Sequence, residues 1–224
     1  MTTLTKICGL RTAEALEAAL DERADFVGFV FFPPSPRHVS LDLGRELGAR
    51  VEGRARKVAL TVDADDTTHA AIMEALKPDL LQLHGHETPE RVAALKARFG
   101  LPVMKAIPLE TLTDLDAIPA YAAVADWVLF DARAPKDATR PGGLGKPFDW
   151  TLLKGLDPGR PFMLSGGLEP GNVGQALEVT RAPAVDVSSG VESGPGVKDP
   201  SKIAAFIRAV RAADAARTKV ASSL

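Results

Sequence analysis

The sequence contains a single cysteine, Cys8, among 224 residues. One cysteine allows no internal disulfide, and this fits a reducing compartment, so we expect a cytoplasmic location. The chain also has no apolar run of the roughly 18 residues that a membrane helix needs. No basic segment precedes a hydrophobic stretch in the manner of a secretory signal. We therefore expect no membrane partner.

Strong charge of one sign is missing as well. Lys and Arg total 27 against 29 Asp and Glu, which gives a net charge of −2, and no five like charges stand together. Such a balance gives no indication of a nucleic-acid surface, and we expect no nucleic-acid partner. Hydrophobic residues make up 46% of the chain, an ordinary share for a globular protein, and the length fits one domain.

Motifs for nucleotides and metals are incomplete. Residues 140–147 resemble a P-loop, but Arg140 stands where the first glycine belongs and Pro147 where Ser or Thr belongs. We interpret this segment as a glycine-rich loop able to fold over a ligand. The pair His84 and His86 has no further clustered ligand, whereas metal sites use three or four. We therefore expect no metal site at this pair.

Eight units, each a short apolar run followed by a helical pattern, fill the chain without a linker. The apolar runs are rich in Val, Ile, Leu and Phe, as strands buried on both faces should be. Unbroken alternation predicts an α/β fold with a parallel sheet, and eight units favour a single-domain (β/α)8 TIM barrel over an open doubly wound sheet. The predicted strands are Leu4–Cys8, Phe26–Phe31, Lys57–Val62, Leu80–His84, Pro102–Ala106, Trp127–Asp131, Pro161–Ser165 and Ala184–Ser188.

The helical segments carry recognisable starts. Thr88, Pro89 and Glu90 supply an N-cap, a proline at the first helical position and an acid in the first turn. Asp199 and Pro200 begin the last helix in the same way. The segment 148–155 is barely two turns long, so the sixth helix is the weakest. We expect the barrel to occupy residues 1–211 and residues 212–224, which are small and polar, to fray.

Two glycine turns near the end of the chain follow the seventh and eighth predicted strands. They are Leu164–Leu168, with Gly166 and Gly167, and Val187–Val191, with Ser189 and Gly190. Glycine lets backbone N–H groups crowd around a ligand, and a helix N-terminus beyond each turn would add positive potential. In barrels of this class the loops after strands 7 and 8 commonly bind phosphate. We expect these two turns to hold one phosphate between them.

Two side chains that can move protons stand at the ends of predicted strands. Alternation places Cys8 and Lys6 on one face of the first strand and Ile7 on the other. If Ile7 packs on the helices, Cys8 points into the barrel mouth beside a cation that would raise its thiolate fraction. Asp131 ends the sixth strand after an apolar run, where a carboxyl can stay protonated and act as an acid. A packed thiol and a loop carboxylate bound to Arg133 remain the alternatives.

Further polar candidates lie at the same predicted mouth. Gln82 and His84 share the barrel face of the fourth strand, where buried polar groups need partners, and this favours ligand contact. Arg37 follows three prolines in a stiff loop that can aim a guanidinium at a carboxylate. Lys105 in the fifth strand is either a charge partner or the Schiff-base lysine of an aldolase, and the sequence does not choose. Asp186 in the eighth strand completes the set.

Many separate motifs in this order resemble the phosphoribosylanthranilate isomerase family, from Lys6 to about Val210. They are Lys6–Leu10, Gly28–Phe31, Ser35–Arg37, Leu81–Gly85, Gly142–Lys146, Phe148–Trp150, Ser165–Leu168, Asp186–Glu192 and Gly196–Asp199.

The resemblance implies a function for most of these candidates. It implies an Amadori rearrangement of the phosphosugar substrate N-(5-phosphoribosyl)anthranilate, with Asp131 as general acid, Cys8 as general base and no cofactor. It places the phosphate at Gly166, Gly167, Ser189 and Gly190 and the anthranilate carboxylate at Arg37. Asp186 is similar to a residue near the ligand.

Three positions depart from the family pattern: Leu144 and Pro147 stand where threonine is usual, and Asp63 where asparagine is common. These departures bear on loop dynamics and substrate fit. Two other functions stay open, another phosphosugar barrel enzyme and a phosphate-binding protein without catalysis. Outer helices look alike with or without a partner, so a monomer and a homodimer are both compatible with the sequence.

Overall fold

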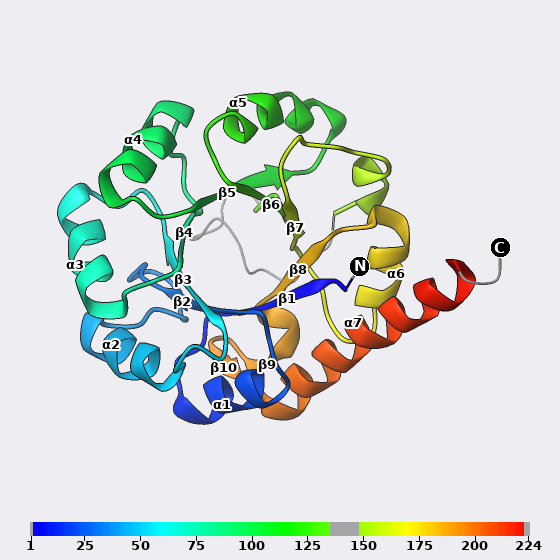
Figure 1. The fold of residues 1–224 in the computed structure, drawn as a ribbon, viewed down its shortest axis with the longest axis horizontal. Helices are drawn as coiled ribbons and strands as arrows, with labels where there is room; N and C mark the ends of the chain where they lie inside the picture. Colours follow the sequence, from blue (N-terminus) through cyan, green and yellow to red (C-terminus); the bar gives the residue numbers. More distant parts are fainter. Residues whose placement is uncertain (1, 135–147, 222–224) are drawn as a thin grey trace.

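A computed structural model describes residues 2–134 and 148–221. Its centre is a closed ring of eight parallel strands in chain order, so the predicted barrel is confirmed (Figure 1). Helices surround the ring on the outside. The strands are β1 (Leu4–Cys8), β2 (Phe26–Val30), β3 (Arg56–Thr61), β4 (Leu80–Leu83), β5 (Val103–Leu109), β6 (Trp127–Ala132), β7 (Phe162–Leu164) and β8 (Ala184–Val187).

The outer helices begin at polar caps that the sequence supplies. Thr12, Ser40, Asp65 and Thr88 each accept a backbone N–H of the first turn, and Thr88 with Pro89 confirms the predicted start of its helix. The helices are α1 (Ala13–Asp21), α2 (Leu41–Arg50), α3 (Asp66–Leu76), α4 (Pro89–Phe99), α5 (Ile118–Ala122), α6 (Val173–Thr180) and α7 (Pro200–Ala221), with 3-10 turns η1 (Leu112–Ala117), η2 (Trp150–Leu153) and η3 (Ser189–Val191). Within the described residues no helix could span a membrane.

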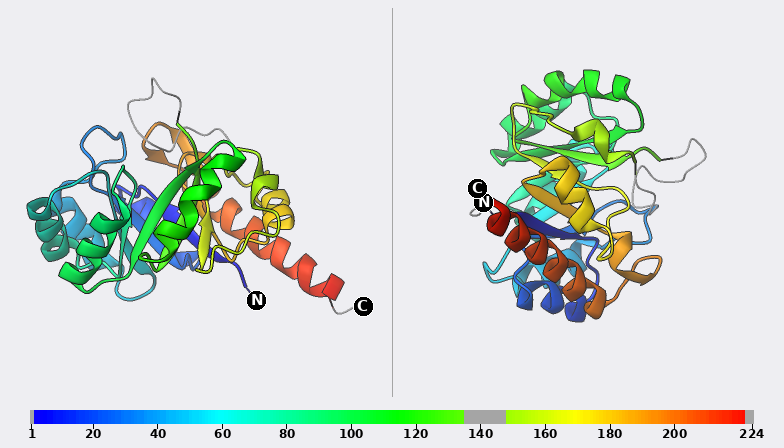
Figure 2. Two further views of the ribbon diagram at one scale, coloured as in Figure 1. Left: turned by 90° about the horizontal axis from the view of Figure 1, so that it is seen from above. Right: turned by 90° about the vertical axis from the view of Figure 1, so that its right-hand side faces the viewer.

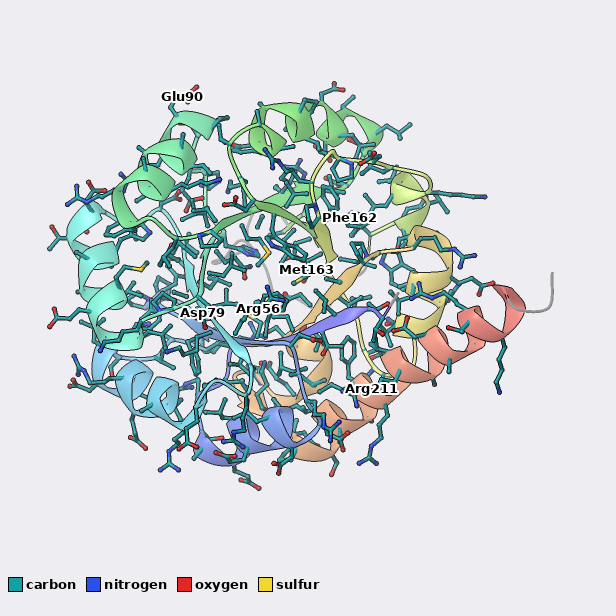
Figure 3. All side chains as sticks on the ribbon, in the orientation of Figure 1. Arg56, Asp79, Glu90, Phe162, Met163 and Arg211 are labelled. Carbon is teal, nitrogen blue, oxygen red and sulfur yellow. The ribbon has the colours of Figure 1, made fainter. Side chains whose placement is uncertain are left out.

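Strand alternation sorts the buried side chains into two compartments. Ile7, Leu81 and Leu83 belong to the large cluster between strands and helices. A smaller apolar cluster inside the ring includes Phe26, Leu129 and Met163, and Figure 3 shows Met163 near the centre of the ring. Because odd and even positions of a strand face opposite ways, the neighbours of Ile7, Leu81 and Leu83 face the barrel interior. The site side chains are therefore held by the same pattern that builds the core.

Three segments differ from the simplest prediction. The helix predicted after the sixth strand is only the 3-10 turn η2, as the short segment 148–155 indicated. A two-stranded hairpin, β9 (Glu192–Gly194) with β10 (Val197–Lys198), follows β8 and was not predicted from the sequence. The last helix α7 continues to Ala221, past the boundary expected at residue 211 (Figure 2).

The far end of α7 is tied to the start of β1. Asp214 accepts hydrogen bonds from the backbone N and the Oγ1 of Thr3, each at 2.7 Å. Arg217 also donates to Thr3 Oγ1 at 2.7 Å and pairs with Asp214. These contacts give Asp214 and Arg217 a specific partner, Thr3, directly before the first strand.

Candidate active site

Cys8 ends β1 and lies inside the barrel. Its neighbour Ile7 packs on the helices, so the predicted orientation of the thiol is confirmed. Only 3% of Cys8 is exposed. Gly28 of β2 leaves the room that this arrangement needs, since a Cβ there would lie 3.0 Å from Cys8 Sγ and 3.2 Å from Lys6 Nζ. The thiol and the ammonium group therefore flank the same glycine.

Lys6, Asp186 and Ser165 form a buried chain beside the thiol. Lys6 Nζ lies 2.8 Å from Asp186 Oδ1, and Ser165 Oγ donates to Asp186 Oδ2 at 3.1 Å. Burial alone would lower the pKa of Lys6, but the attraction of Asp186 and Cys8 outweighs it and raises that pKa. Lys6 is therefore a permanent cation, and its charge is compensated across β1, β7 and β8.

Lys6 acts on the thiol in the expected direction, but burial has the larger effect on the pKa of Cys8. Burial raises the pKa of Cys8, and the nearby Asp186 carboxylate raises it further, whereas Lys6 lowers it. The cation that the sequence predicted is present, but desolvation of the thiolate outweighs its effect. Cys8 is consequently a protonated thiol at neutral pH, and a ligand or a rise in pH has to favour its ionisation.

Asp131 lies near the end of β6 in contact with two hydrogen-bond donors. Its Oδ1 accepts the backbone N–H of Ala132 at 2.9 Å, and its Oδ2 lies 3.2 Å from His84 Nε2. At the opposite edge of the His84 imidazole, Nδ1 lies 3.0 Å from Gln82 Nε2. Arg133, the alternative partner, binds Glu110 and Asp114 instead. The structure thus joins three of the predicted site residues into one chain.

Arg37 is buried at the mouth and already holds a carboxylate. Its Nε and Nη2 donate to the two oxygens of Glu192 at 2.7 and 2.9 Å. Glu192 also accepts from Lys198 Nζ at 2.6 Å, and the same ammonium group binds Ser188 O at 3.0 Å. Burial alone would raise the pKa of Glu192, but these two cations lower it. The hairpin after β8 therefore fixes Arg37 to the second glycine turn.

The two glycine turns pack directly against each other. Gly166 and Gly167 have φ of +83° and +66°, which side chains rarely adopt. A Cβ at Gly190 would lie only 1.9 Å from the Leu168 carbonyl oxygen. Among the described residues, the N–H of Gly167 has no backbone acceptor. The structure therefore places a free donor in the first turn, directly beside the second turn.

Further hydrogen bonds tie these two turns to the residues around them. Ser188 Oγ donates to Cys8 O at 3.2 Å, which ties the second turn to the end of β1. Asn172 closes the first turn, because its side chain binds Gly167 O and Glu169 N, each at 2.9 Å. Only the first turn precedes a helix of ordinary length, α6, since Ser189–Val191 is a single 3-10 turn.

Lys105 faces away from the barrel interior. Its Nζ binds Gly85 O at 2.7 Å and pairs with the Glu87 carboxylate at 2.9 Å, and it lies over the ring of Tyr121. Of the two possibilities left open by the sequence, the structure shows the charge partner. A Schiff-base lysine would need a free amine inside the barrel mouth.

The second histidine of the pair is separate from the site. His86 is exposed and binds Asp63, while His84 turns to Asp131. In the part of the chain that the structure describes, no group of three or more His, Cys, Asp or Glu side chains could hold a metal ion. The predicted glycine-rich loop, with the departures Leu144 and Pro147, lies outside the described residues.

Residues 5–209 match the family model of N-(5'-phosphoribosyl)anthranilate (PRA) isomerase. The chain belongs to this family. It is 68% identical over 212 residues to the N-(5'-phosphoribosyl)anthranilate isomerase of Bradyrhizobium diazoefficiens, with 95% of each chain covered. It is 66% identical to the enzyme of that name from Nitrobacter hamburgensis, over 96% of this chain and 95% of that one. These relatives place the chain among isomerases.

Solved structures of phosphoribosyl anthranilate isomerase have the same fold. The enzyme from Thermotoga maritima is 33% identical, with a TM-score of 0.86, and the alignment covers 94% of this chain and all of that one. A complex with reduced 1-(o-carboxyphenylamino)-1-deoxyribulose 5-phosphate is 31% identical, with a TM-score of 0.82, over 94% of this chain and 100% of that one. The family resemblance that the motifs indicated is confirmed.

Several residues of this site were not predicted from the sequence. Ser165, Glu192 and Lys198 stand within motifs of the isomerase family, but no role was predicted for them. Ser165 and Glu192 contact residues distant in sequence; Ser165 and Asp186 are 21 positions apart, and Arg37 and Glu192 are 155 positions apart. The only local signal is a carboxylate and a lysine on a short turn-rich segment after the eighth strand.

Proposed function

We propose that this chain performs the Amadori rearrangement of N-(5-phosphoribosyl)anthranilate in tryptophan biosynthesis with Cys8 as general base and Asp131 as general acid. Family membership supports the reaction. The observation that supports the assignment of roles is the position of both groups. They face the same end of one barrel, each connected to buried polar partners, Lys6 for Cys8 and His84 for Asp131.

In the first step Asp131 donates its proton to the furanose ring oxygen of the substrate. The bond between that oxygen and the anomeric carbon breaks, and the anthranilate nitrogen supplies the electron pair that forms an iminium ion. The carboxylate left on Asp131 is held by the Ala132 N–H and by His84. General acid catalysis of this kind contributes about 10² to 10⁴ in rate.

In the second step the Cys8 thiolate removes the proton from C2 of the opened sugar. The electron pair of that C–H bond neutralises the iminium and forms an enamine, which becomes the ketose product after proton transfer. The Lys6 cation next to Cys8 stabilises the thiolate form, and the positive iminium of the substrate adds to this effect. Because burial raises the pKa of Cys8, the thiol first releases its own proton to water, and the opened, positively charged substrate favours this ionisation.

The substrate is held at its two charged ends. The adjacent glycine turns, with donors at Gly166, Gly167, Ser189 and Gly190, bind the phosphate. Arg37 meets the anthranilate carboxylate in the orientation that Glu192 imposes. Gln82, His84 and Asp186 line the space between the two ends. These assignments require a substrate that spans the barrel mouth from β2 to β8.

The decisive assay follows the loss of fluorescence as freshly made phosphoribosylanthranilate is consumed. Cys8→Ser and Asp131→Asn should each lower kcat by orders of magnitude while circular dichroism and the melting temperature show a folded barrel. Near-normal turnover in either variant would end that role assignment. Inorganic phosphate should compete with the substrate, and its failure to do so would count against the two-turn site.

We propose a cytoplasmic location, in line with the single cysteine. For the assembly, a monomer and a homodimer are both in keeping with relatives, since one solved structure describes monomers of the dimeric Thermotoga maritima enzyme. Light scattering coupled to size-exclusion chromatography decides between them. A mass near 23.7 kDa indicates a monomer, and twice that mass a dimer.

A further inference from the structure

We propose that His84, held in one tautomer by Gln82, is a positioning residue that decides which oxygen of Asp131 carries the catalytic proton. The inference rests on the proposed role of Asp131 as general acid and adds two residues to that step. It concerns the hydrogen-bonded chain from Gln82 through His84 to Asp131, which joins the barrel strands β4 and β6.

The proposal rests on the geometry of this hydrogen-bonded chain. Gln82 is fully buried and its Nε2 lies 3.0 Å from His84 Nδ1. An amide nitrogen can only donate, so His84 Nδ1 is the acceptor and carries no proton. The proton of the neutral ring then resides on Nε2, which lies 3.2 Å from Asp131 Oδ2. Oδ2 is thus occupied as an acceptor.

The other oxygen of Asp131 is left to hold the acid proton. Oδ1 accepts only the Ala132 N–H among the described residues, and a carboxyl oxygen that accepts one hydrogen bond can still carry a hydrogen. Oδ1 also faces the first phosphate turn, because a Cβ at Gly166 would lie 3.1 Å from it. The proton is therefore presented toward the side of the barrel where the phosphosugar is held.

His84 also changes the free energy of the proton transfer from Asp131 to the substrate. The Nε2–H donates to a neutral carboxyl before the step and to a carboxylate after it. Hydrogen bonds to charged groups are stronger than neutral ones, so this contact stabilises the product of proton donation more than its reactant. Loss of one such bond is expected to lower kcat by about 10- to 100-fold.

The opposite orientation of the amide would have the reverse effect. With Gln82 Oε1 toward His84, Nδ1 would carry the proton and Nε2 would accept the proton of Asp131. The acid proton would then be directed at the ring and away from the substrate. Gln82 Oε1 has no partner among the described residues, so neither orientation satisfies every polar atom of the amide. The tautomer of His84 is the observable that separates the two arrangements.

The charged groups on the strands around Asp131 already have partners. Lys105 of β5 pairs with Glu87 on the outer side, and Asp186 of β8 binds Lys6. Arg133, two positions beyond Asp131, binds Asp114. Within the described residues, His84 is the ionisable side chain in direct contact with the Asp131 carboxyl. A change at His84 should therefore register on Asp131 directly.

The first test needs no substitution and no substrate. Nitrogen-15 spectra of histidine-labelled protein report which ring nitrogen carries the proton. We expect a proton on Nε2 and none on Nδ1. A ring that carries a proton on Nδ1 would overturn the proposal, because Gln82 would then not hold the tautomer that donates to Asp131 Oδ2.

The second test compares the kinetics of variants. His84→Leu should lower kcat by about 10- to 100-fold with little change in KM. His84→Gln keeps an N–H donor and should recover part of the loss. Gln82→Leu should let the Nδ1–H tautomer appear in the nitrogen spectrum.

His69 offers a matched control. It is a buried histidine of α3, bound to Thr61 Oγ1 at 3.1 Å and to Asp65 O at 2.9 Å, outside the barrel interior. His69→Gln should lower the melting temperature but leave kcat and its pH profile unchanged. Equal effects of His69→Gln and His84→Leu on kcat and its pH profile would reduce His84 to a structural residue and overturn the proposal.

The outcomes separate this inference from the role of Asp131 itself. If Asp131→Asn keeps its activity while the nitrogen spectrum shows the Nε2–H tautomer, the general acid lies elsewhere and the proposed function fails. If Asp131→Asn is inactive but His84→Leu leaves kcat unchanged, Asp131 is still the general acid and the positioning role of His84 is contradicted.

Discussion

Lys6 Nζ and Asp186 Oδ1 lie 2.8 Å apart in the interior of the barrel, where Lys6 is fully buried. The pair joins the first and last strands of the ring, β1 to β8, at the point where the ring closes. It also sets the charge beside Cys8, because Lys6 lowers the pKa of the thiol and Asp186 raises it. One ion pair thus serves both the closure of the barrel and the chemistry of its mouth.

Replacement of Lys6 by Met should damage both properties. Asp186 would be left as a buried, uncompensated charge, and loss of one partner of a buried pair costs about 3–5 kcal/mol of unfolding free energy. The thiol pKa should rise further, because the stabilising cation is gone. Urea unfolding measures the first effect, and ultraviolet absorbance of the single thiolate measures the second. A thiol titration identical to that of the wild type would show that Lys6 does not act on Cys8.

The pH dependence of the free energy of unfolding should show the raised pKa of Cys8. Burial raises its pKa above the ordinary 9.0, so the folded state prefers the neutral thiol. That preference adds stability below the thiol pKa of the unfolded chain, and the contribution is lost as the pH rises through the folded-state pKa. Relative to Cys8→Ala, the wild type should lose unfolding free energy above about pH 8.5. A constant difference between the two proteins from pH 7 to pH 10 would contradict this.

Glu192→Gln should release Arg37 and Lys198 together. The neutral amide cannot compensate two buried cations, so we expect a loss of about 3–5 kcal/mol near neutral pH and a raised KM for the substrate. Because the two cations lower the pKa of Glu192, its contribution is present above the ordinary value of 4.5 and disappears as the pH falls through the lowered one. Unfolding curves of both proteins should therefore converge in acid. A KM equal to that of the wild type would show that Arg37 does not depend on Glu192.

Gly190→Ala should disrupt the contact between the two glycine turns. A methyl group 1.9 Å from the Leu168 carbonyl oxygen forces the turns apart. We expect a much higher inhibition constant for inorganic phosphate and a lower melting temperature. Gly174→Ala in α6 is the matched control, since nothing lies within 4 Å of its Cβ. Alanine there should add about 0.5–1 kcal/mol of stability and leave phosphate inhibition unchanged.

The sequence predicted the barrel well because each strand carries its own local signal. The predicted β1 matches the structure, and alternation correctly placed Ile7 outside and Cys8 inside. The same period put Gln82 and His84 on one face. Prediction was weaker where opposing effects on a pKa had to be compared, and where the contacting residues are far apart in the sequence. Burial outweighed the effect of Lys6 on the thiol, and the partner of Arg37 is a hairpin residue far along the chain.

The link between Thr3 and Asp214 has a practical consequence. It brings the beginning of β1 and the end of α7 together at the face where the strands start, whereas the candidate site lies where the strands finish. A circular permutant that joins these neighbouring segments by a short peptide, with new ends opened in an exposed helix connection, should therefore still assemble. Fusion partners attached beside Asp214 would likewise leave the reaction mouth open to solvent.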